Sequence, residues 1–272
     1  FDAMGADTPV LVDLKPSGQH YMEDLYRAGG LAPILRALGD SLNLDCLTVS
    51  GRTLREDIDS AEPDWGQQVV KTKAAPIYKE GGIAVLRGNL APGGAIIKQS
   101  AAEILQHEGR AVVFSSLEDM ADRLDSPDLD VQADDVLVLQ NAGPKGAPGM
   151  PESGYIPIPK KLAQAGVKDM VRISDARMSG TAFGSIVLHC TPEAAVGGPL
   201  GLVRNGDRIR LDVANRSLML LVDDAELEKR KADFQAPYHE GQDRGYLKLY
   251  LDQVTQADTG ADFEFLRAVK RD

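Results

Sequence analysis

The feature that most constrains the fold is a succession of short β-rich segments between residues 83 and 222. The segments are rich in Val, Ile and Leu, and Gly, Pro or Asp residues bound them. They lie at residues 83–90, 94–100, 111–116, 135–140, 170–174, 185–190, 207–213 and 217–222. Because many short strands and few long helices occur together here, the sequence predicts a closed or nearly closed β-barrel. Asn205-Gly206 also predicts a hairpin between 200–204 and 207–213, since this pair suits a tight turn.

Helical patterns dominate the chain before this region and recur within it. The expected helices are 21–28, 31–38, a segment from Thr53, 117–124 with Ser116 as its cap, 157–165, 224–234 with Asp223 as its cap, and 245–254 in the tail. Residues 8–14 read as a buried strand. The polar, aperiodic segment 58–73 favours a domain boundary. We therefore predict an α/β segment at residues 1–68 and a β-barrel-like α+β domain at residues 69–272 that ends in a helical tail. Trp65 is expected to pack one domain on the other.

Composition limits the possible partners and the compartment. The 272 residues include 41 acidic and 30 basic side chains, and the net charge of −11 disfavours nucleic acid or an anionic membrane as a partner. The sequence contains no apolar run of bilayer length and no signal-peptide pattern at its start, and it begins without Met, as expected of a chain that starts inside a longer protein. Two cysteines, Cys46 and Cys190, make no disulfide framework, so a cytoplasmic location is the simplest interpretation. We expect both cysteines in the core.

Two loops rich in Gly and Pro carry the candidate chemistry. The first, GPKGAPGMPE, ends in Glu152, and the second, in RISDARMSGTAFG, carries Ser179 and Thr181 between glycines. Ordered loops on a rigid scaffold often hold functional residues, although tight turns alone explain such a composition. Basic residues lie near both loops, and they indicate either a pocket for an anion or a solvated positive patch: Lys145, Lys160, Lys161, Arg172 and Arg177.

These two motifs, together with HCTPEAAVGGPLGLVRNGDRIRLD, closely resemble the iron–sulfur dehydratases of dihydroxy acids and sugar acids. That family includes dihydroxy-acid, phosphogluconate and pentonate dehydratases. The segments GMPESGYIPIPKKL and ISDARMSGTAFG look most like those of the sugar-acid branch, of the arabinonate or xylonate type. The resemblance runs along essentially the whole chain but covers only the later part of the family's chain. It implies that residues 1–68 are the remnant, the C-terminal end, of an α/β N-terminal domain, and that a barrel-like C-terminal domain follows.

The resemblance also implies a reaction, a set of cofactors and a site. The reaction eliminates water from a 2,3-dihydroxy acid to give a 2-keto-3-deoxy acid, with a [2Fe–2S] cluster and Mg²⁺. Glu152 would be a Mg²⁺ ligand, since this cation takes carboxylate oxygens. Ser179 would be the base at C2, acting as an alkoxide, with Thr181 beside it as a hydrogen-bond partner for the substrate or for the base. Arg177 and Lys145 are further candidates, for contact with the substrate.

The cysteines depart from the family's pattern. Clusters of this kind need Cys thiolates, and neither Cys46 nor Cys190 falls in the family's cluster-ligand motifs, which lie upstream together with the other Mg²⁺ ligands. The sequence thus predicts no cluster ligand in this chain, inactivity in isolation, and dependence on the upstream part of the same protein. A homo-dimer or homo-tetramer is expected from the resemblance. Three alternatives stay open: a dihydroxy-acid dehydratase of branched-chain amino-acid synthesis, a cluster-free binding module, and a purely structural swivelling domain.

Overall fold

The computed structural model describes residues 2–61 and 66–267, and the chain divides into two compact units, Phe1–Ile83 and Ala84–Asp272. Trp65 lies outside the described residues, so its expected packing role stays a prediction. Across the described part of the chain, we find no helix with the length and apolar character needed to cross a membrane. Each unit is described below by itself.

In the described residues of the first unit, the regular elements are short helices separated by irregular segments. Its elements are α1 (Asp2–Ala6), α2 (Met22–Arg27), α3 (Leu31–Leu38), the 3₁₀ turn η1 (Gly39–Ser41) and α4 (Leu54–Asp59). The expected helices at 21–28, 31–38 and after Thr53 are confirmed. Thr53 begins α4 because its hydroxyl accepts a hydrogen bond from the Glu56 amide at 3.2 Å. The predicted strand at 8–14 is wrong: in the described residues this segment makes isolated bridges, at Val10, Val12 and Leu14, since its partners are irregular segments rather than strands.

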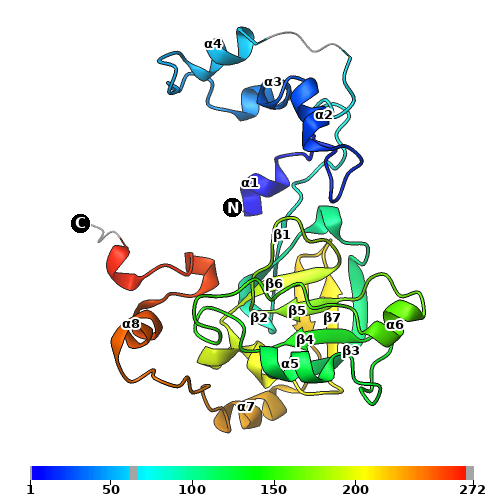
Figure 1. Ribbon diagram of the computed structural model, residues 1–272, viewed down its shortest axis with the longest axis vertical. Helices are drawn as coiled ribbons and strands as arrows, with labels where there is room; N and C mark the ends of the chain where they lie inside the picture. The colour runs from blue at the N-terminus through cyan, green and yellow to red at the C-terminus, as the bar shows by residue number, and fades with distance from the viewer. Residues whose placement is uncertain (1, 62–65, 268–272) are drawn as a thin grey trace. The chain divides into compact units, whose positions relative to one another are not determined.

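In the described residues of the second unit, eight strands form a closed barrel (Figure 1). They are β1 (Ala84–Gly88), β2 (Ala91–Ile97), β3 (Gln106–Phe114), β4 (Val136–Leu139), β5 (Arg172–Ser174), β6 (Ile186–Thr191), β7 (Arg208–Asp212) and β8 (Ser217–Leu220). Their order around the barrel is β1-β2-β6-β5-β4-β3-β7-β8. The run from β3 through β4 and β5 to β6 is parallel. The predicted barrel is confirmed.

Side chains alternate between two cores along β4, which is buried on both faces. Val136 and Val138 join the barrel interior, whereas Leu137 and Leu139 join an outer cluster. The outer cluster is covered by α5 (Leu117–Arg123) and by residues in and around α6 (Lys160–Gln164). The Ser116 hydroxyl caps α5 by accepting from the Asp119 amide, as predicted. The expected helix at 157–165 is present but shorter. This packing makes the β4–β5 region a rigid base for the loops that follow both strands.

The predicted hairpin around Asn205-Gly206 is wrong. The segment before it is a 3₁₀ turn, η4 (Pro199–Leu202), and β7 pairs with β3 and β8 instead. Gly206 does adopt a positive φ of 92°, as the Asn-Gly pair predicts. However, the Asn205 side chain accepts from the Val113 amide at 2.7 Å, so the turn is attached to β3 rather than to a preceding strand. Further short 3₁₀ turns are η2 (Gln99–Ala101), η3 (Ala194–Val196), η5 (Ala257–Thr259) and η6 (Glu264–Leu266).

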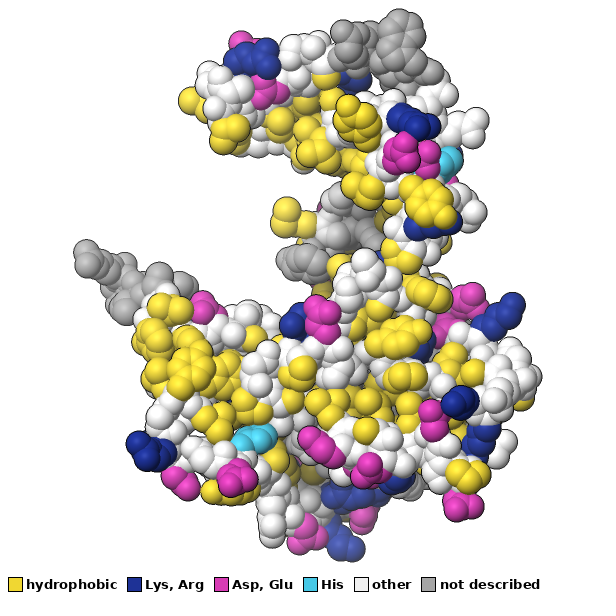
Figure 2. Space-filling view, in the orientation of Figure 1, with side chains coloured by type: hydrophobic (Ala, Val, Ile, Leu, Met, Phe, Trp, Pro, Cys, Tyr) yellow, Lys and Arg dark blue, Asp and Glu magenta, His cyan; other side chains and the backbone are white. Residues whose placement is uncertain are grey.

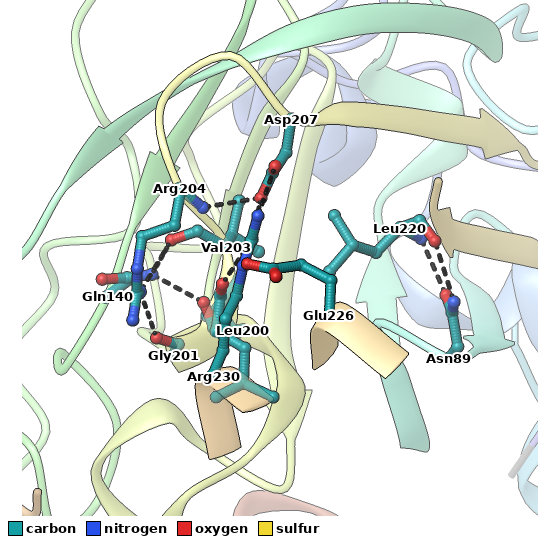
Figure 3. Close-up of polar contacts among 11 residues, drawn as sticks. Asn89, Gln140, Leu200, Gly201, Val203, Arg204, Asp207, Leu220, Glu226 and Arg230 are labelled. Carbon is teal, nitrogen blue, oxygen red and sulfur yellow. Dashed lines mark hydrogen bonds and ion pairs between the residues drawn. The ribbon is translucent and has the colours of Figure 1, made fainter. Parts of the chain in front are cut away.

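Partly buried polar contacts hold α7, the first helix after the barrel strands, on the barrel (Figure 3). Helix α7 (Asp224–Ala232) begins at Asp223, whose side chain accepts from the Ala225 amide. Arg230 of α7 pairs with Asp207 at 2.5 Å and donates to the Leu202 carbonyl at 3.0 Å. The tail continues through α8 (Gly245–Gln253), close to the predicted 245–254. The C-terminal segment is therefore an integral part of the barrel unit, and Gln256 from this segment reaches the candidate site.

Candidate functional site

The two Gly/Pro loops leave the barrel at the same edge. The first follows β4 and the second follows β5, and these strands are parallel neighbours whose last residues, Leu139 and Ser174, are paired. Because the carboxyl ends of neighbouring parallel strands meet at one edge of a sheet, the loops begin side by side. The two motifs are far apart in the sequence, but they come together because each loop is attached to one of two rigid neighbouring strands.

Arg177 connects the two loops directly. Its Nη1 atom lies 2.6 Å from Glu152 Oε1, and its Nε donates to the Met150 carbonyl at 2.6 Å. The Arg177 carbonyl in turn accepts from the Gly154 amide at 2.8 Å. A Cβ at Gly154 would lie 2.9 Å from that carbonyl oxygen and 2.3 Å from Leu188 Cδ2, so only glycine allows this approach. The structure thus brings Glu152 and Arg177 into contact, with both side chains about half exposed.

Ser179 and Thr181 form a hydroxyl pair two residues beyond Arg177. Their side-chain oxygens lie 2.9 Å apart, and the Thr181 amide donates weakly to Ser179 Oγ at 3.4 Å. Lys98, which follows β2, donates from Nζ to the Gly180 carbonyl between them at 2.9 Å. The sequence analysis missed Lys98 because it carries no motif, and only the pairing of β2 with β6 brings it here. Its ammonium group places a positive charge beside the hydroxyl pair.

Lys145 lies in the first loop but turns toward the C-terminal segment. Its amide donates to Glu193, and its carbonyl accepts from His239 Nε2 at 2.8 Å. Lys145 lines a cavity of about 370 Å³ together with Ala195 and several residues between 236 and 252. Among the described contacts, none joins Lys145 to Glu152 or to the hydroxyl pair.

The basic residues near the two loops do not form one solvent-exposed patch. Arg172 is 2% exposed and pairs with Asp169 at 2.7 Å, so for this residue the interpretation as a solvated patch is wrong. It also donates to the Ile156 carbonyl, which fixes the backbone that follows Glu152. Lys161 donates to the Leu129 carbonyl beside α6. Arg172 is a basic residue in the sequence, but in the fold its charge is paired with Asp169 rather than exposed to solvent.

Two buried carboxylates lie behind the loops, and the sequence analysis missed both. Asp175 accepts from the amides of Ala142 and Ala194 at 2.9 and 2.8 Å, and burial raises its pKa to about 7. Glu193 accepts from the amides of Lys145 and Gly146. Burial lowers the pKa of the neighbouring His189, and the Arg177 charge adds to this effect. Single acidic residues in SDAR and TPEAA carry no sequence signal that could have identified these contacts.

Whether this chain can hold a metal ion or an iron–sulfur cluster depends on which ligand side chains it offers. Among the described residues, no group of three His, Cys, Asp or Glu side chains could hold a metal ion. Glu152, a half-exposed carboxylate at a loop end, fits Mg²⁺ as one ligand of a larger set. Cys190 lies in the barrel core, as predicted, and burial raises the pKa of its thiol, so it does not fit a cluster. Cys46 is exposed, so its predicted core position is wrong: it lies in an irregular loop outside the small core of the first unit.

Comparison with known families gives two matches. The model of the dihydroxy-acid/6-phosphogluconate dehydratase C-terminal domain matches residues 68–261, and that of the N-terminal domain of the same family matches residues 1–57. Together they account for most of the chain, and residues 58–67 lie between the two matched ranges.

Individual relatives agree with the family match. The chain is 50% identical to an L-arabonate dehydratase of Azospirillum brasilense over 97% of its length, and 48% identical to a 6-deoxy-6-sulfo-D-gluconate dehydratase of Pseudomonas putida over 98%. It is 42% identical to a dihydroxy-acid dehydratase of Methanothrix thermoacetophila over 96%. These alignments cover 47%, 46% and 48% of the respective relatives, so the chain spans about half the length of the curated relatives it matches. Both family models and all three relatives agree on the assignment: the chain belongs to the dihydroxy-acid and 6-phosphogluconate dehydratase family.

Proposed function

We propose that this chain is the C-terminal part of a sugar-acid (aldonate) dehydratase, a hydro-lyase that converts a 2,3-dihydroxy acid to a 2-keto-3-deoxy acid. The observation that carries the proposal is the joining of two loops by Arg177, which brings a carboxylate and a hydroxyl pair to one edge of the barrel. Higher identity to the two sugar-acid dehydratases than to the dihydroxy-acid dehydratase supports the substrate class. In this proposal residues 1–68 end an α/β N-terminal domain, residues 69–272 form the barrel-like domain, and the enzyme is cytoplasmic.

The chemistry of the reaction explains why these residue types are needed. The reaction breaks the C2–H and C3–O bonds. The C2 proton, which is only weakly acidic beside an ionised carboxylate, passes to a base, and charge develops on the substrate as it leaves. The C3 hydroxyl takes up a proton and leaves as water, and the resulting enol tautomerises to the 2-keto acid. Glu152 would hold Mg²⁺ with ligands from the preceding part of the protein. When bound, Mg²⁺ supplies charge neutralisation at the substrate carboxylate and lowers the pKa of nearby oxygen atoms. The [2Fe–2S] cluster implied by the family resemblance does not fit the cysteines of this chain, since Cys190 is buried in the barrel core and Cys46 lies in a loop of the first unit.

The chain's own residues then have separate roles. Ser179 Oγ accepts the C2 proton, and the Thr181 hydroxyl, 2.9 Å away, donates a hydrogen bond that stabilises the deprotonated serine. Lys98 fixes the backbone between them and adds a favourable positive charge. Arg177 holds Glu152 in place from the side of the second loop. The proposal also includes contact of Arg177 or Lys145 with the substrate.

The experiment is an activity assay on the full-length protein that carries this chain. Purified anaerobically with Mg²⁺, it is expected to form a 2-keto-3-deoxy acid from at least one member of a panel of five- and six-carbon aldonates. Turnover of 2,3-dihydroxy-3-methylbutanoate alone would instead support the second candidate, a dihydroxy-acid dehydratase, which the 42% identity to such an enzyme favours. Binding of aldonates without turnover of any substrate would support a binding module.

We also propose that the protein is a homo-dimer or homo-tetramer. Hydrophobic side chains gather over α8 and the segment after it (Figure 2). Tyr246 of α8 and Phe265 and Leu266 of η6 are 60–72% exposed, which is a large exposed fraction for apolar side chains of this size. Light scattering after gel filtration tests the proposal, and a monomeric full-length protein would contradict it.

A further inference from the structure

Asp175 and Glu193 are buried carboxylates without an assigned role in the proposed chemistry. Each is about 1% exposed. Within residues 2–61 and 66–267, neither makes an ion pair with Lys, Arg or His, and their partners are backbone amides and one glutamine. Burying a carboxylate without a cation lowers the stability of the folded protein. We therefore expect these two buried carboxylates to have a role other than stabilising the fold.

Glu193 holds the middle of the first loop. Its carboxylate accepts from the Lys145 amide at 2.9 Å, from the Gly146 amide at 2.9 Å and from Gln256 Nε2 at 2.6 Å. A Cβ at Gly143 would lie 2.7 Å from Glu193 Oε2, so the loop closes around this carboxylate only because that position is glycine. Gln256 Oε1 accepts from the Glu193 amide at 2.8 Å and thereby fixes the residue that holds the loop.

Asp175 holds the beginning of the same loop. It follows β5 directly, and its Oδ1 accepts from the Ala142 amide at 2.9 Å. Its other oxygen accepts from the Ala194 amide at 2.8 Å, next to Glu193 in the chain. Two residues after Asp175, Arg177 holds the end of the loop through Met150 and Glu152. The loop is thus fixed at its start, middle and end.

We propose that Glu193 and Asp175 are positioning residues that hold the loop of residues 142–152 in the shape that presents Glu152 to a divalent cation. The inference rests on the proposed function, because it takes Glu152 as a metal ligand. Two backbone hydrogen bonds lie within the loop, from the Ala147 amide to the Gly143 carbonyl and from the Met150 amide to the Ala147 carbonyl. A Gly/Pro loop with so few internal hydrogen bonds has many conformations, and a carboxylate that accepts two adjacent amides selects one of them. Residues that orient a metal ligand typically change metal affinity about 10–100-fold when they are replaced.

Metal binding in the full-length protein tests the proposal without relying on turnover. The variants are Glu193→Gln, Glu193→Ala and Asp175→Asn, and the readout is the Mn²⁺ dissociation constant from the electron paramagnetic resonance signal of free Mn²⁺. We expect an increase of about 10-fold or more for Glu193→Ala and a smaller one for Glu193→Gln, whose amide oxygen keeps one acceptor. The value of kcat should fall more for Glu193→Ala than for Glu193→Gln, while KM for the aldonate changes less.

Asp135→Asn is the matched control. Asp135 is 3% exposed and pairs with Arg110, and it lies before β4, at the opposite end of the strand from the loop. This variant should lose stability but keep the Mn²⁺ dissociation constant of the wild type. If Glu193→Ala and Asp175→Asn stay folded and bind Mn²⁺ as the wild type does, the positioning role is refuted even when the wild type is an active dehydratase. Conversely, a wild type that binds Mn²⁺ but dehydrates no aldonate refutes the proposed function, and a graded loss of affinity in the variants still supports the positioning role.

Discussion

Burial of Asp175 should make the unfolding free energy of the chain depend on pH in an identifiable way. Burial raises the pKa of this carboxyl from its ordinary 3.8 to about 7 in the folded protein, and the nearby charge of Glu193 adds to the effect. The unfolded chain releases the proton near pH 3.8, whereas the folded chain keeps it until about pH 7. The folded state therefore binds more protons than the unfolded state in this range, and stability falls as pH rises.

The magnitude follows from the size of the pKa change. Each pKa unit corresponds to about 1.4 kcal/mol, so the loss attributable to Asp175 is about 4 kcal/mol between pH 4 and pH 8. The stabilising contribution is fully present below pH 3.8, declines through the interval, and is absent above about pH 7. Asp175→Asn removes the titrating group while keeping its shape, so the variant should lack this decline.

Urea unfolding of the wild type and of Asp175→Asn at several pH values measures the effect. The quantity of interest is the difference between the two unfolding free energies, because other titrating groups contribute equally to both proteins. We expect this difference to change steadily in favour of the variant as pH rises from 4 to 7, and then to stay constant. A difference that does not vary with pH over this range would refute the argument that burial, rather than the two amide donors, dominates at Asp175.

Three further predictions concern the proposed chemistry in the full-length protein. Ser179→Ala should lower kcat by about 10²–10⁴-fold and abolish solvent exchange of the C2 proton, since a positioned base contributes this much; normal exchange in a folded variant would remove Ser179 from the role of base. Glu152→Gln should weaken Mg²⁺ binding, so that excess Mg²⁺ restores part of the activity; a loss of activity that does not depend on Mg²⁺ would argue against a ligand role. The isolated 272-residue chain should show no [2Fe–2S] absorbance after anaerobic reconstitution, and a stoichiometric cluster spectrum would contradict the view that cluster ligands lie elsewhere.

Local sequence signals predicted the parts of the fold that depend on local contacts. Helix α3 begins and ends at the predicted residues, and the caps of α5 and α7 were identified from Ser116 and Asp223. The hairpin at Asn205-Gly206 failed for a different reason. The turn geometry was right, but the Asn205 side chain bonds to Val113, 92 residues away, and this contact decides which strand lies beside the turn. No short window of sequence contains that information.

The candidate site shows the same division between local and distant information. The motifs identified Glu152, Ser179 and Thr181 as candidates, because Gly/Pro loops carry a composition signal. Asp175 and Glu193 carry none, since their partners in the first loop lie 33 and 48 residues away in the sequence. Cys46 was misplaced because a single apolar-looking residue says little about burial in a short segment with a small core.

The barrel edge explains why one part of a site can be held in order by this chain alone. Parallel pairing of β4 with β5 brings the two loops to the same edge, and Arg177 and the two buried carboxylates fix the first loop at three points. All of these contacts lie within residues 84–272. In the proposed enzyme, the barrel would therefore present Glu152 and Ser179 in a fixed arrangement, and the preceding domain would supply the remaining metal ligands and the cluster. Loss of activity on separating the two parts would then come from missing ligands rather than from a collapsed loop.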